Sequence, residues 1–396
     1  MPRILRVMNR FNLGGPTFNA SYLTKYLPSE YETLLVGGIK DPSEESSEFI
    51  LEQLGIKPII ISEMQRSINL KNDYAAFIIL KNIICDFKPD IVHTHASKAG
   101  TLGRLAAISM KVPYIVHTFH GHVFNAYFNK ISSAFYKNIE RYLASHSTKI
   151  IAISNKQKEE LSNIHHICSP EKIEVIPLGF DLDKFHNNMD FKRKTFRERY
   201  MIDDDEIAIS IIGRIVQVKN HPLFIDAVNY VKNNSNKKIR VFIVGDGDAR
   251  LPLEEKIKNI GIDFTDWNTA PVKSTITFTS WIKEVDYVTS GSEIIALTSF
   301  DEGTPVSLIE AQASDKPVIS TNVGGIEDVV IPGKTALLSP NGDVDSFSKN
   351  LLLLVEDDNL RKEMSTNGWN FVSQKFNYTR LVNDTAKLYE KIMNNK

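Results

Sequence analysis

The sequence predicts an α/β protein with two doubly wound, Rossmann-like domains that face each other across a cleft. Short apolar runs rich in Val and Ile alternate with segments of helical spacing, as in a parallel sheet covered by helices on both faces. The alternation stops around residues 177–206, which include the charged stretch FKRKTFRERY, and then restarts. The chain of 396 residues is also about twice as long as one ordinary domain requires.

The first half of the chain contains a series of predicted strands, each a short apolar run bounded by turn residues. They are Arg3–Met8, Thr33–Val36, Ile59–Ile61, Asp90–Thr94, Tyr114–His117 and Ile150–Ile153. The segments between them place apolar residues three or four positions apart, which is the spacing of an amphipathic helix. They are Asn19–Leu27, Ser46–Leu54, Asp73–Ile84, Thr101–Met110 and Lys156–Ile164.

The same alternation returns in the second half, where Pro222–Val231 is the first predicted helix. The predicted strands are Ile207–Ile212, Arg240–Val244, Ile276–Thr279, Ile294–Leu297 and Pro317–Ser320. From Asp343 onward the pattern is helical throughout. We therefore expect a first domain over residues 1–185, a second over 186–375 and a C-terminal helix over 376–396. Ligands of such domains bind at the carboxyl ends of the strands.

Composition and charge fit a folded enzyme or binding protein. Hydrophobic residues make up 42% and charged residues 24% of the chain, which excludes an intrinsically disordered protein. The net charge of -1 gives no field that would attract nucleic acid. Residues 1–180 are mildly basic, with 20 Lys and Arg against 16 Asp and Glu. Cys85 and Cys168 lack metal-binding spacing, and the start of the chain lacks a signal-peptide pattern. We expect a cytoplasmic protein, with any membrane contact peripheral and at the inner face.

A glycine-rich loop, Asn12-Leu-Gly-Gly-Pro-Thr, follows the first predicted strand. Gly14 and Gly15 let backbone N–H groups approach a ligand closely, and Pro16 suits the first position of a helix. The N–H groups at a helix N-terminus bind anions. The loop does not match GxGxxG, which argues against a dinucleotide-dependent dehydrogenase. A phosphate contact and a plain turn both remain open here.

Histidines gather after two of the predicted strands. Half of the 10 histidines in the chain lie at positions 93, 95, 117, 120 and 122. We expect histidines two positions apart to point to opposite sides of the sheet, and neither carboxylates nor thiolates accompany them, so we predict no metal site. His93 and His117 are expected to bond loop carbonyls. His120 is the best candidate for contact with a polar ligand, because an imidazole can orient a hydroxyl or stabilise developing charge.

Two basic residues follow the first predicted strand of the second domain. Arg214 comes directly after that strand and Gly213, and Lys219 follows five positions later. The planar fork of arginine and the flexible charge of lysine together suit a diphosphate. A solvated basic pair is the alternative, and the position of Arg214 directly after a buried strand favours the diphosphate clamp.

Two glutamates, Glu302 and Glu310, flank a Gly-Thr-Pro turn that begins a predicted helix. The free N–H groups at the start of this helix can bind phosphate or sugar hydroxyls. Carboxylates accept hydrogen bonds from neighbouring hydroxyls of a sugar or a ribose. Glu310 lies in the otherwise apolar run Val306–Ala313, where a carboxylate is uncommon without a partner. We therefore interpret both glutamates as ligand-binding rather than as solvated charges.

Residues 123–143 interleave aromatic and aliphatic side chains with Lys130, Lys137 and Arg141 at helical spacing. This pattern is typical of an amphipathic helix that lies on a membrane surface. A helix that packs its apolar face on the core and exposes a basic face fits the pattern equally well. A peripheral membrane contact through 123–143 is thus one of two interpretations.

Together these motifs resemble the retaining, nucleotide-sugar-dependent glycosyltransferases of family 4, which have the GT-B architecture. The resemblance covers nearly the whole chain and is specific, because many motifs occur in the same order and at the same spacing. The motifs are NLGGPT, DIVHTHASKAG, VHTFHGH, IAIS, VIPLGFDLDKF, GRIVQVKN, FIVGDGD, DEGTPVSLIEAQAS and PVISTNVGGIEDVV. The resemblance also implies that the C-terminal helix crosses back to the first domain.

The resemblance implies a role for each candidate residue. His120 matches the histidine beside the transferred sugar, and Arg214 and Lys219 match the pair that holds the diphosphate. Glu302 matches the glutamate near the donor sugar, which completes the expected catalytic set. Glu310 matches the glutamate that binds the ribose hydroxyls.

The resemblance also implies backbone contacts with the donor. The expected donor-binding positions beyond those above are Gly14 and Gly15 near the phosphates, Trp281 and Ile282 near the base, and Gly303, Thr304, Pro305 and Val306 near the sugar. Many family members carry an aromatic residue where this chain has Thr304, so the resemblance leaves the donor sugar open.

The implied reaction transfers a hexosyl group from a UDP- or GDP-sugar to a hydroxyl, with retention and without a metal or other cofactor. The expected acceptor is a glycan or a lipid-linked oligosaccharide in surface polysaccharide synthesis. A non-hydrolysing nucleotide-sugar epimerase of the same fold is an alternative, and it would convert the donor alone. A non-catalytic sugar-binding protein is a second alternative, although such proteins are generally exported.

Overall fold

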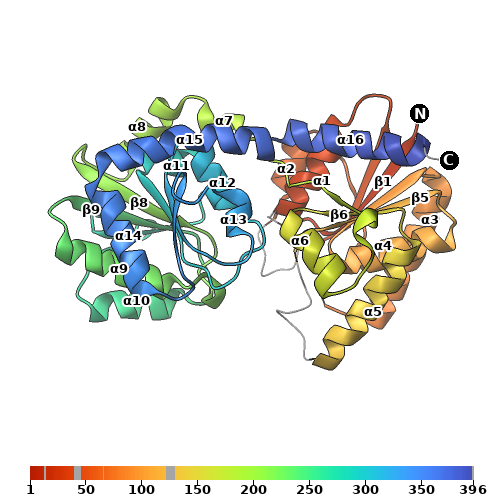
Figure 1. The fold of residues 1–396 in the computed structure, drawn as a ribbon, viewed down its shortest axis with the longest axis horizontal. Helices are drawn as coiled ribbons and strands as arrows, with labels where there is room; N and C mark the ends of the chain where they lie inside the picture. The colour runs from red at the N-terminus through yellow and green to blue at the C-terminus, as the bar shows by residue number, and fades with distance from the viewer. Residues whose placement is uncertain (13–14, 40–45, 66, 122–129, 395–396) are drawn as a thin grey trace. The chain divides into compact units, whose positions relative to one another are not determined.

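The computed structural model describes residues 1–12, 15–39, 46–65, 67–121 and 130–394. The chain divides into two compact units, Met1–Phe180 with Phe376–Lys396, and Asp181–Lys375. Each unit is a parallel sheet covered by helices on both faces (Figure 1). The chain therefore has two doubly wound α/β units, as its sequence predicts.

The first unit contains a seven-stranded sheet in the order β3-β2-β1-β4-β5-β6-β7, and all neighbouring strands are parallel. The strands are β1 (Arg3–Arg10), β2 (Glu32–Gly38), β3 (Ile59–Ile60), β4 (Ile91–His95), β5 (Tyr114–Phe119), β6 (Lys149–Ala152) and β7 (Ile173–Val175). Every strand that the sequence predicts in this unit is present. The edge strand β7 is missing from the prediction because three residues are too few to form a recognisable pattern.

Alternating side chains of this sheet face two different layers of helices. Leu5 and Val92 pack toward α3 (Leu70–Phe87) and α4 (Ser97–Ser109), whereas Ile4 and Ile91 pack toward α1 (Gly15–Tyr26) and α16 (Tyr378–Asn394). The remaining helices of the unit are α2 (Glu48–Gln53), α5 (Lys130–His146), α6 (Asn155–Glu159), a π-helical turn at Glu160–Ile164 and a 3-10 turn at Pro170–Lys172.

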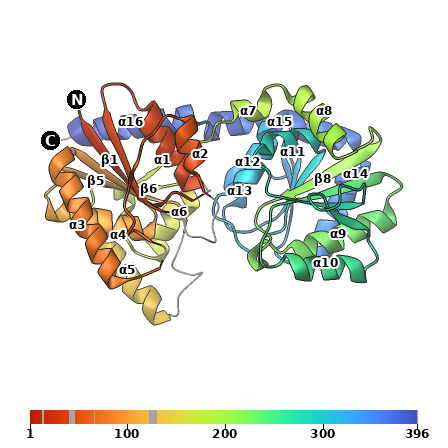
Figure 2. The same cartoon turned by 180° about the vertical axis from the view of Figure 1, so that it is seen from behind.

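The last helix of the chain, α16, belongs to the first unit and lies beside α1 (Figure 2). Its residues Leu381, Leu388 and Tyr389 are buried in the core of that unit. Its first turn is held by Arg380, whose guanidinium donates to the carbonyl oxygens of Pro177 and Leu178 at 2.6 and 2.8 Å. The predicted return of the C-terminal helix to the first unit is thus part of the fold.

The second unit contains a seven-stranded parallel sheet in the order β10-β11-β9-β8-β12-β13-β14. The strands are β8 (Glu206–Ile212), β9 (Lys238–Val244), β10 (Phe264–Asp266), β11 (Ile276–Ser280), β12 (Ile294–Leu297), β13 (Val318–Thr321) and β14 (Ala336–Ser339). The predicted strands are present, and the prediction misses only the short edge strands β10 and β14.

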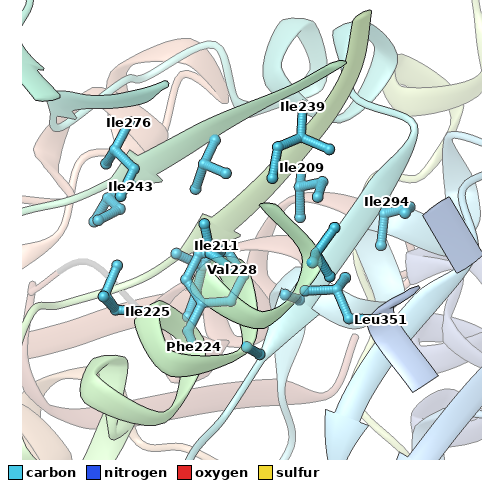
Figure 3. Packing of buried hydrophobic residues seen from close by; sticks show 14 of the residues in the cluster. Ile209, Ile211, Phe224, Ile225, Val228, Ile239, Ile243, Ile276, Ile294 and Leu351 are labelled. Atoms are coloured by element: carbon cyan, nitrogen blue, oxygen red, sulfur yellow. The ribbon is translucent and has the colours of Figure 1, made fainter. Parts of the chain in front are cut away.

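The core of the second unit lies mainly between its sheet and the helices α9 (His221–Asn234), α10 (Arg250–Asn259) and α14 (Val344–Glu356). Figure 3 shows Ile209 and Ile211 of β8 packed beside Phe224 and Val228 of α9. The other helices are α7 (Asp183–His186), α8 (Met189–Arg199), α11 (Val285–Gly291), α12 (Val306–Ala313), α13 (Ile326–Val329) and α15 (Asp358–Phe376).

The charged stretch that interrupts the sequence pattern is an ordinary helix of the second unit rather than a linker. It forms α8, and its Phe196 packs with Tyr200 against Phe242 on the opposite face of the sheet from α9. Too few apolar residues stand among its charges for the helical period to show in the sequence. None of the helices in the described part of the chain has the length and apolar character needed to cross a membrane.

Candidate functional site

Two loops of the second unit bring Lys219 and Glu302 together. Lys219 ends a 3-10 turn, Gln217–Lys219, after β8, and Glu302 lies between β12 and α12. The backbone N–H of Phe300 donates to the carbonyl of Val218 at 2.8 Å, and the Thr298 hydroxyl donates to the carbonyl of Lys219 at 3.0 Å. These bonds fix the two loops side by side at the carboxyl ends of neighbouring strands, where α/β sheets bind ligands.

One oxygen of the Glu302 carboxylate is bonded by two neighbouring side chains. Its Oε1 lies 2.5 Å from Lys219 Nζ and accepts a hydrogen bond of 2.5 Å from the Ser299 hydroxyl. The two charged side chains are only 21% and 11% exposed. A charge pair in such surroundings attracts strongly, and the loss of one partner leaves the other uncompensated. The sequence predicts both residues but not their pairing.

Two glycines after β13, Gly324 and Gly325, pack against the backbone of the Glu302 loop. Gly325 N–H donates to the carbonyl of Glu302 at 2.9 Å. A Cβ atom on Gly324, whose φ is +51°, would lie 1.9 Å from that carbonyl oxygen, and one on Gly325 would lie 2.0 Å from the carbonyl oxygen of Gly303. Only glycine permits this approach. The role of Gly324 and Gly325 is not predicted from the sequence, where the only signal is two consecutive glycines after a predicted strand.

Arg214 lies in the same loop as Lys219, after β8. Its side chain is exposed and makes no hydrogen bond or ion pair within the described part of the chain. The Lys219 side chain passes close to Gly213, since a Cβ there would lie 3.7 Å from Lys219 Cε. The residue before Arg214 is thus in contact with the lysine stem, and the guanidinium is available for an anion.

Helix α12 begins at Val306, directly after the Gly303-Thr304-Pro305 turn, with Pro305 at its N-cap. Thr304 and Val306 are partly buried and Gly303 is exposed. The first N–H groups of a helix have no partner within the helix and carry partial positive charge. The turn predicted from the sequence therefore places a helix N-terminus, which can attract an anion, in the same loop as Glu302.

Glu310 lies on α12, and its carboxylate makes no hydrogen bond with any residue that the structure describes. Burial raises the pKa of its carboxyl to about 7, with Asp286 raising it further and Lys184 opposing the shift. A desolvated carboxyl without a partner is suited to hydroxyl ligands, because two hydrogen bonds would replace the water that burial removes. A perturbed pKa of this kind is common at functional sites.

Trp281 and Ile282 follow β11 directly. They belong to a different loop from Lys219 and Glu302. Ile282 packs against the aromatic cluster of Phe196 and Tyr200 and lines a cavity of about 120 Å³ beside it. Trp281 is 42% exposed. No hydrogen bond links either residue to Lys219 or Glu302 among the contacts of the described chain. Their predicted place at the base of the donor stays a prediction.

His120 belongs to the first unit and follows β5. Its Nε2 lies 3.0 Å from Nδ1 of His95, which ends β4. Burial lowers the pKa of His120 to about 4, so the ring is neutral near pH 7. Its Nδ1 is buried and has no partner within the described residues. A neutral imidazole with one free nitrogen can bond a ligand hydroxyl as donor or acceptor.

Two expectations about the histidines are wrong. His93 and His95 lie on the same side of the sheet, with rings stacked 4.3 Å apart, because side chains two positions apart along a strand share a face. His93 and His117 bond hydroxyls rather than loop carbonyls: His93 Nε2 lies 2.7 Å from Thr118 Oγ1, and His117 Nδ1 lies 2.8 Å from Thr94 Oγ1. His122 lies outside the described residues.

The glycine loop is described only in part. Gly14 lies outside the described residues, and Gly15 is the first residue of α1. Asn19 donates to the carbonyl of Gly15 at 2.9 Å and to that of Gly179 at 3.3 Å, which fixes the first turn of the helix. A strand, a glycine loop and a helix thus follow each other as predicted, and the phosphate contact stays a prediction.

Within the described ranges, no three His, Cys, Asp or Glu side chains converge as metal ligands would. A hollow of about 350 Å³ in the second unit lies elsewhere, at the amino ends of β9 and β11, where Lys238 and Lys273 line it. Its cations are paired with carboxylates, such as Lys238 with Asp205 at 2.8 Å. The Lys219–Glu302 loops at the opposite ends of the strands are therefore the better candidate site.

Comparison with known proteins identifies the class of protein to which this chain belongs. A family model described as Glycosyltransferase Family 4 matches residues 15–184, and one described as Glycosyl transferases group 1 matches residues 192–371. Solved structures show the same fold. HepE of Anabaena in complex with UDP has a TM-score of 0.79 at 17% identity over 99% of this chain and 100% of that chain. A glycosyltransferase of Rickettsia africae has a TM-score of 0.81 at 20% identity over 100% and 99%.

The chain belongs to the GT-B glycosyltransferases. One relative is the UDP-Gal:alpha-D-GlcNAc-diphosphoundecaprenol alpha-1,3-galactosyltransferase of Escherichia coli, which is 32% identical over 345 residues, 86% of this chain and 85% of that protein. Another is the capsular polysaccharide biosynthesis glycosyltransferase CapM of Staphylococcus aureus, which is 23% identical over 335 residues, 83% of this chain and 85% of that protein.

Proposed function

We propose that this protein is a retaining glycosyltransferase of family 4 that transfers a hexosyl group from a UDP-sugar to a lipid-linked oligosaccharide in surface polysaccharide synthesis. The structural observation that carries the proposal is the Lys219–Glu302 pair beside the N-terminus of α12. The choice of UDP and of a lipid-linked acceptor follows the Escherichia coli relative, which is named for UDP-Gal and a diphosphoundecaprenol-linked acceptor. The Staphylococcus aureus relative is named for capsule biosynthesis.

The second unit would hold the donor. Lys219, Arg214 and the first N–H groups of α12 supply positive charge for the diphosphate. Glu310 would accept hydrogen bonds from the ribose hydroxyls, for which its unpartnered carboxyl is suited. Glu302 would contact the sugar through the oxygen that neither Lys219 nor Ser299 occupies, since both bond Oε1.

The transfer would proceed on one face of the sugar. The bond from the anomeric carbon to the diphosphate oxygen breaks, and the acceptor oxygen bonds to the same carbon from the same side. The acceptor proton passes to the departing phosphate oxygen, so no enzyme carboxylate becomes covalently bound. Retaining glycosidases use a carboxylate as nucleophile, whereas Glu302 is paired with the Lys219 cation and bonded by Ser299 through Oε1, and we assign it to binding the sugar. His120, as a neutral imidazole, would orient a hydroxyl of the transferred sugar.

We also propose that the reaction needs no divalent cation. Lys219, Arg214 and the α12 N-terminus together can balance the developing charge on the leaving diphosphate, which is the task that a metal ion performs in other transferases. Transfer measured in the presence of EDTA should equal transfer with added Mg²⁺ or Mn²⁺. A loss of activity in EDTA that either ion restores would contradict this.

The predicted membrane contact spans residues 123–143, of which 123–129 lie outside the described ranges. The structure therefore bears only on the part of this segment that lies in α5. One face of α5 is buried, with Leu143 and Ala144 in the core and Glu140 paired with Arg104 at 2.6 Å. Phe135 and Tyr142 are 62% and 51% exposed. We propose that these two aromatic side chains meet the membrane that carries the acceptor. Co-sedimentation with anionic lipid vesicles should fall in Phe135→Ser/Tyr142→Ser, and equal binding would contradict the proposal.

The function is tested by incubating the protein with UDP- and GDP-sugars and a lipid-diphosphate-linked sugar acceptor. Thermal unfolding first selects the nucleotide, because a ligand of the native state raises the apparent stability. NMR of the product then reads the anomeric configuration, which should match that of the donor. An inverted product, or conversion of the donor to its epimer without acceptor, would overturn the proposal.

A further inference from the structure

A continuous chain of buried side chains runs from α16 to His120 within the first unit. The hydroxyl of Tyr389 lies 2.6 Å from Nδ1 of His93. The His93 ring stacks on His95 with centroids 4.3 Å apart, and His95 Nδ1 lies 3.0 Å from His120 Nε2. Tyr389, His93 and His95 are at most 1% exposed. The last helix of the chain is therefore connected to the candidate catalytic imidazole through two other histidines.

Arg6 determines where the protons lie in the first part of this chain. Its NH1 group lies 2.9 Å from the Tyr389 hydroxyl and 3.3 Å from His93 Nδ1. A guanidinium can only donate, so both atoms accept from it. The tyrosine proton therefore points to His93 Nδ1, and His93 carries its own proton on Nε2, which donates to Thr118 Oγ1 at 2.7 Å. Burial and Arg6 lower the pKa of His93, so the ring is neutral near pH 7.

His95 and His120 share one proton across their contact. Burial lowers the pKa of both rings, so both are neutral near pH 7. In the hydrogen bond of 3.0 Å between His95 Nδ1 and His120 Nε2, one nitrogen must therefore donate and the other accept. The choice decides the state of the free His120 Nδ1. If His95 donates, that atom carries a proton and donates to a ligand; if His120 donates, that atom accepts.

The surrounding packing leaves His95 no other position. The cavity that it lines with His93, Thr118, His120 and Thr385 measures only about 10 Å³, which is about the space of one water molecule. The stacked His93 ring, itself held by Tyr389, Arg6 and Thr118, covers one face of His95. The orientation of the His120 ring therefore depends on His95, and the tautomers of the two rings are coupled through their hydrogen bond.

We propose that His95 is a positioning residue for His120, and that Tyr389 and His93 hold His95 in place. The proposal rests on the proposed function, which puts His120 beside the transferred sugar. His95 does not touch the reacting atoms. It orients the His120 ring and sets which tautomer His120 presents to a sugar hydroxyl.

The first test compares His95→Ala with His95→Asn, because the asparagine amide lies where Nδ1 of the histidine lies and can still bond His120. His95→Ala should lower kcat by roughly 10- to 100-fold, as expected for a small misplacement of a reacting group. Binding of UDP, which the second unit would hold, should stay unchanged. His95→Asn should keep most of the activity. A wild-type kcat in His95→Ala, or an equal loss in both variants, overturns the proposal.

The second test uses the tyrosine. Tyr389→Phe removes only the hydroxyl that bonds His93 and should lower kcat. Tyr114→Phe is the matched control, because the Tyr114 hydroxyl donates to the Met393 carbonyl of the same helix at 3.4 Å, away from the histidines. Equal activities of the two variants would contradict a role for α16 in positioning His120.

Imidazole 15N shifts give a readout that does not depend on catalysis. His120 should show one tautomer in the wild type and in His95→Asn, and a mixture in His95→Ala. An unchanged single tautomer in His95→Ala overturns the positioning role, as does a mixture with unchanged kcat. A wild-type protein that transfers no sugar overturns the proposed function instead, while the 15N shifts still decide whether His95 sets the His120 tautomer.

Discussion

Lys219 Nζ lies 2.5 Å from Glu302 Oε1 although the two residues follow different strands, β8 and β12. These strands are neighbours in the sheet, so the loops after them meet at its carboxyl edge. This ion pair restrains the lysine side chain. A diphosphate that binds Lys219 would therefore meet a lysine whose position Glu302 has fixed in advance, which lowers the entropy lost on binding.

Lys219→Ala should reduce transfer by about 100-fold or more, as the removal of one charge-stabilising group does in other enzymes. The measurement is kcat with saturating donor and acceptor. Lys349→Ala is the control, because Lys349 forms an ion pair of similar length, 2.6 Å, with Asp345 on an exposed helix face. Near-normal activity of both Lys219→Ala and Glu310→Ala would refute the assignment of this site.

The contribution of the Lys219–Glu302 pair can also be measured in the free energy of unfolding. Lys219→Met leaves the Glu302 carboxylate, only 11% exposed, without its cation, and should lower the free energy of unfolding by roughly 1–3 kcal/mol. Lys219→Met/Glu302→Gln removes the stranded charge and should recover much of this loss. Denaturant unfolding of both single variants and the double variant measures the coupling. Additive effects would show that the pair contributes nothing to stability.

Gly324→Ala should disrupt the Glu302 loop, since its Cβ would lie 1.9 Å from the Glu302 carbonyl oxygen. We expect a lower melting temperature together with weaker UDP-sugar binding. Gly342→Ala is a sharp control: Gly342 also has a positive φ, +74°, but a Cβ there meets nothing within 4 Å. It should show only the backbone strain of about 1–2 kcal/mol and unchanged binding. Equal effects of the two variants would mean that backbone strain, and not the close approach to the Glu302 carbonyl, is the reason that position 324 requires glycine.

Glu310 should make stability depend on pH. Its pKa in the native protein is about 7, above the ordinary 4.5, so the native state binds more protons than the unfolded state between these values. Stability should therefore fall as pH rises from 4.5 through 7, by on the order of 3 kcal/mol. Thermal unfolding across this range should show the fall in the wild type and a flatter curve in Glu310→Gln. Parallel curves would place the carboxyl in a solvated environment.

Much of the fold follows from local sequence patterns, whereas the contacts within the site do not. Buried parallel strands are short apolar runs, so all but three short edge strands could be predicted. The helix α8 could not be predicted, because its sequence is mostly charged and shows no periodic apolar residues. Glu302 and Lys219 could each be singled out, but their contact depends on the strand order β8-β12, which no local pattern contains. The same holds for Tyr389 and His93, which lie 296 positions apart and share a hydrogen bond.

The place of α16 in the first unit has a consequence for synthesis on the ribosome. Most of the first unit precedes the second unit in the sequence, yet one layer of its core, with Leu381, Leu388 and Tyr389, comes from residues that are made after the second unit. The second unit, Asp181–Lys375, is complete before them. Since domains tend to fold as they emerge, the order of folding should run against the order of the units. A nascent chain released before residue 378 would leave an apolar face of the first sheet uncovered and prone to aggregate.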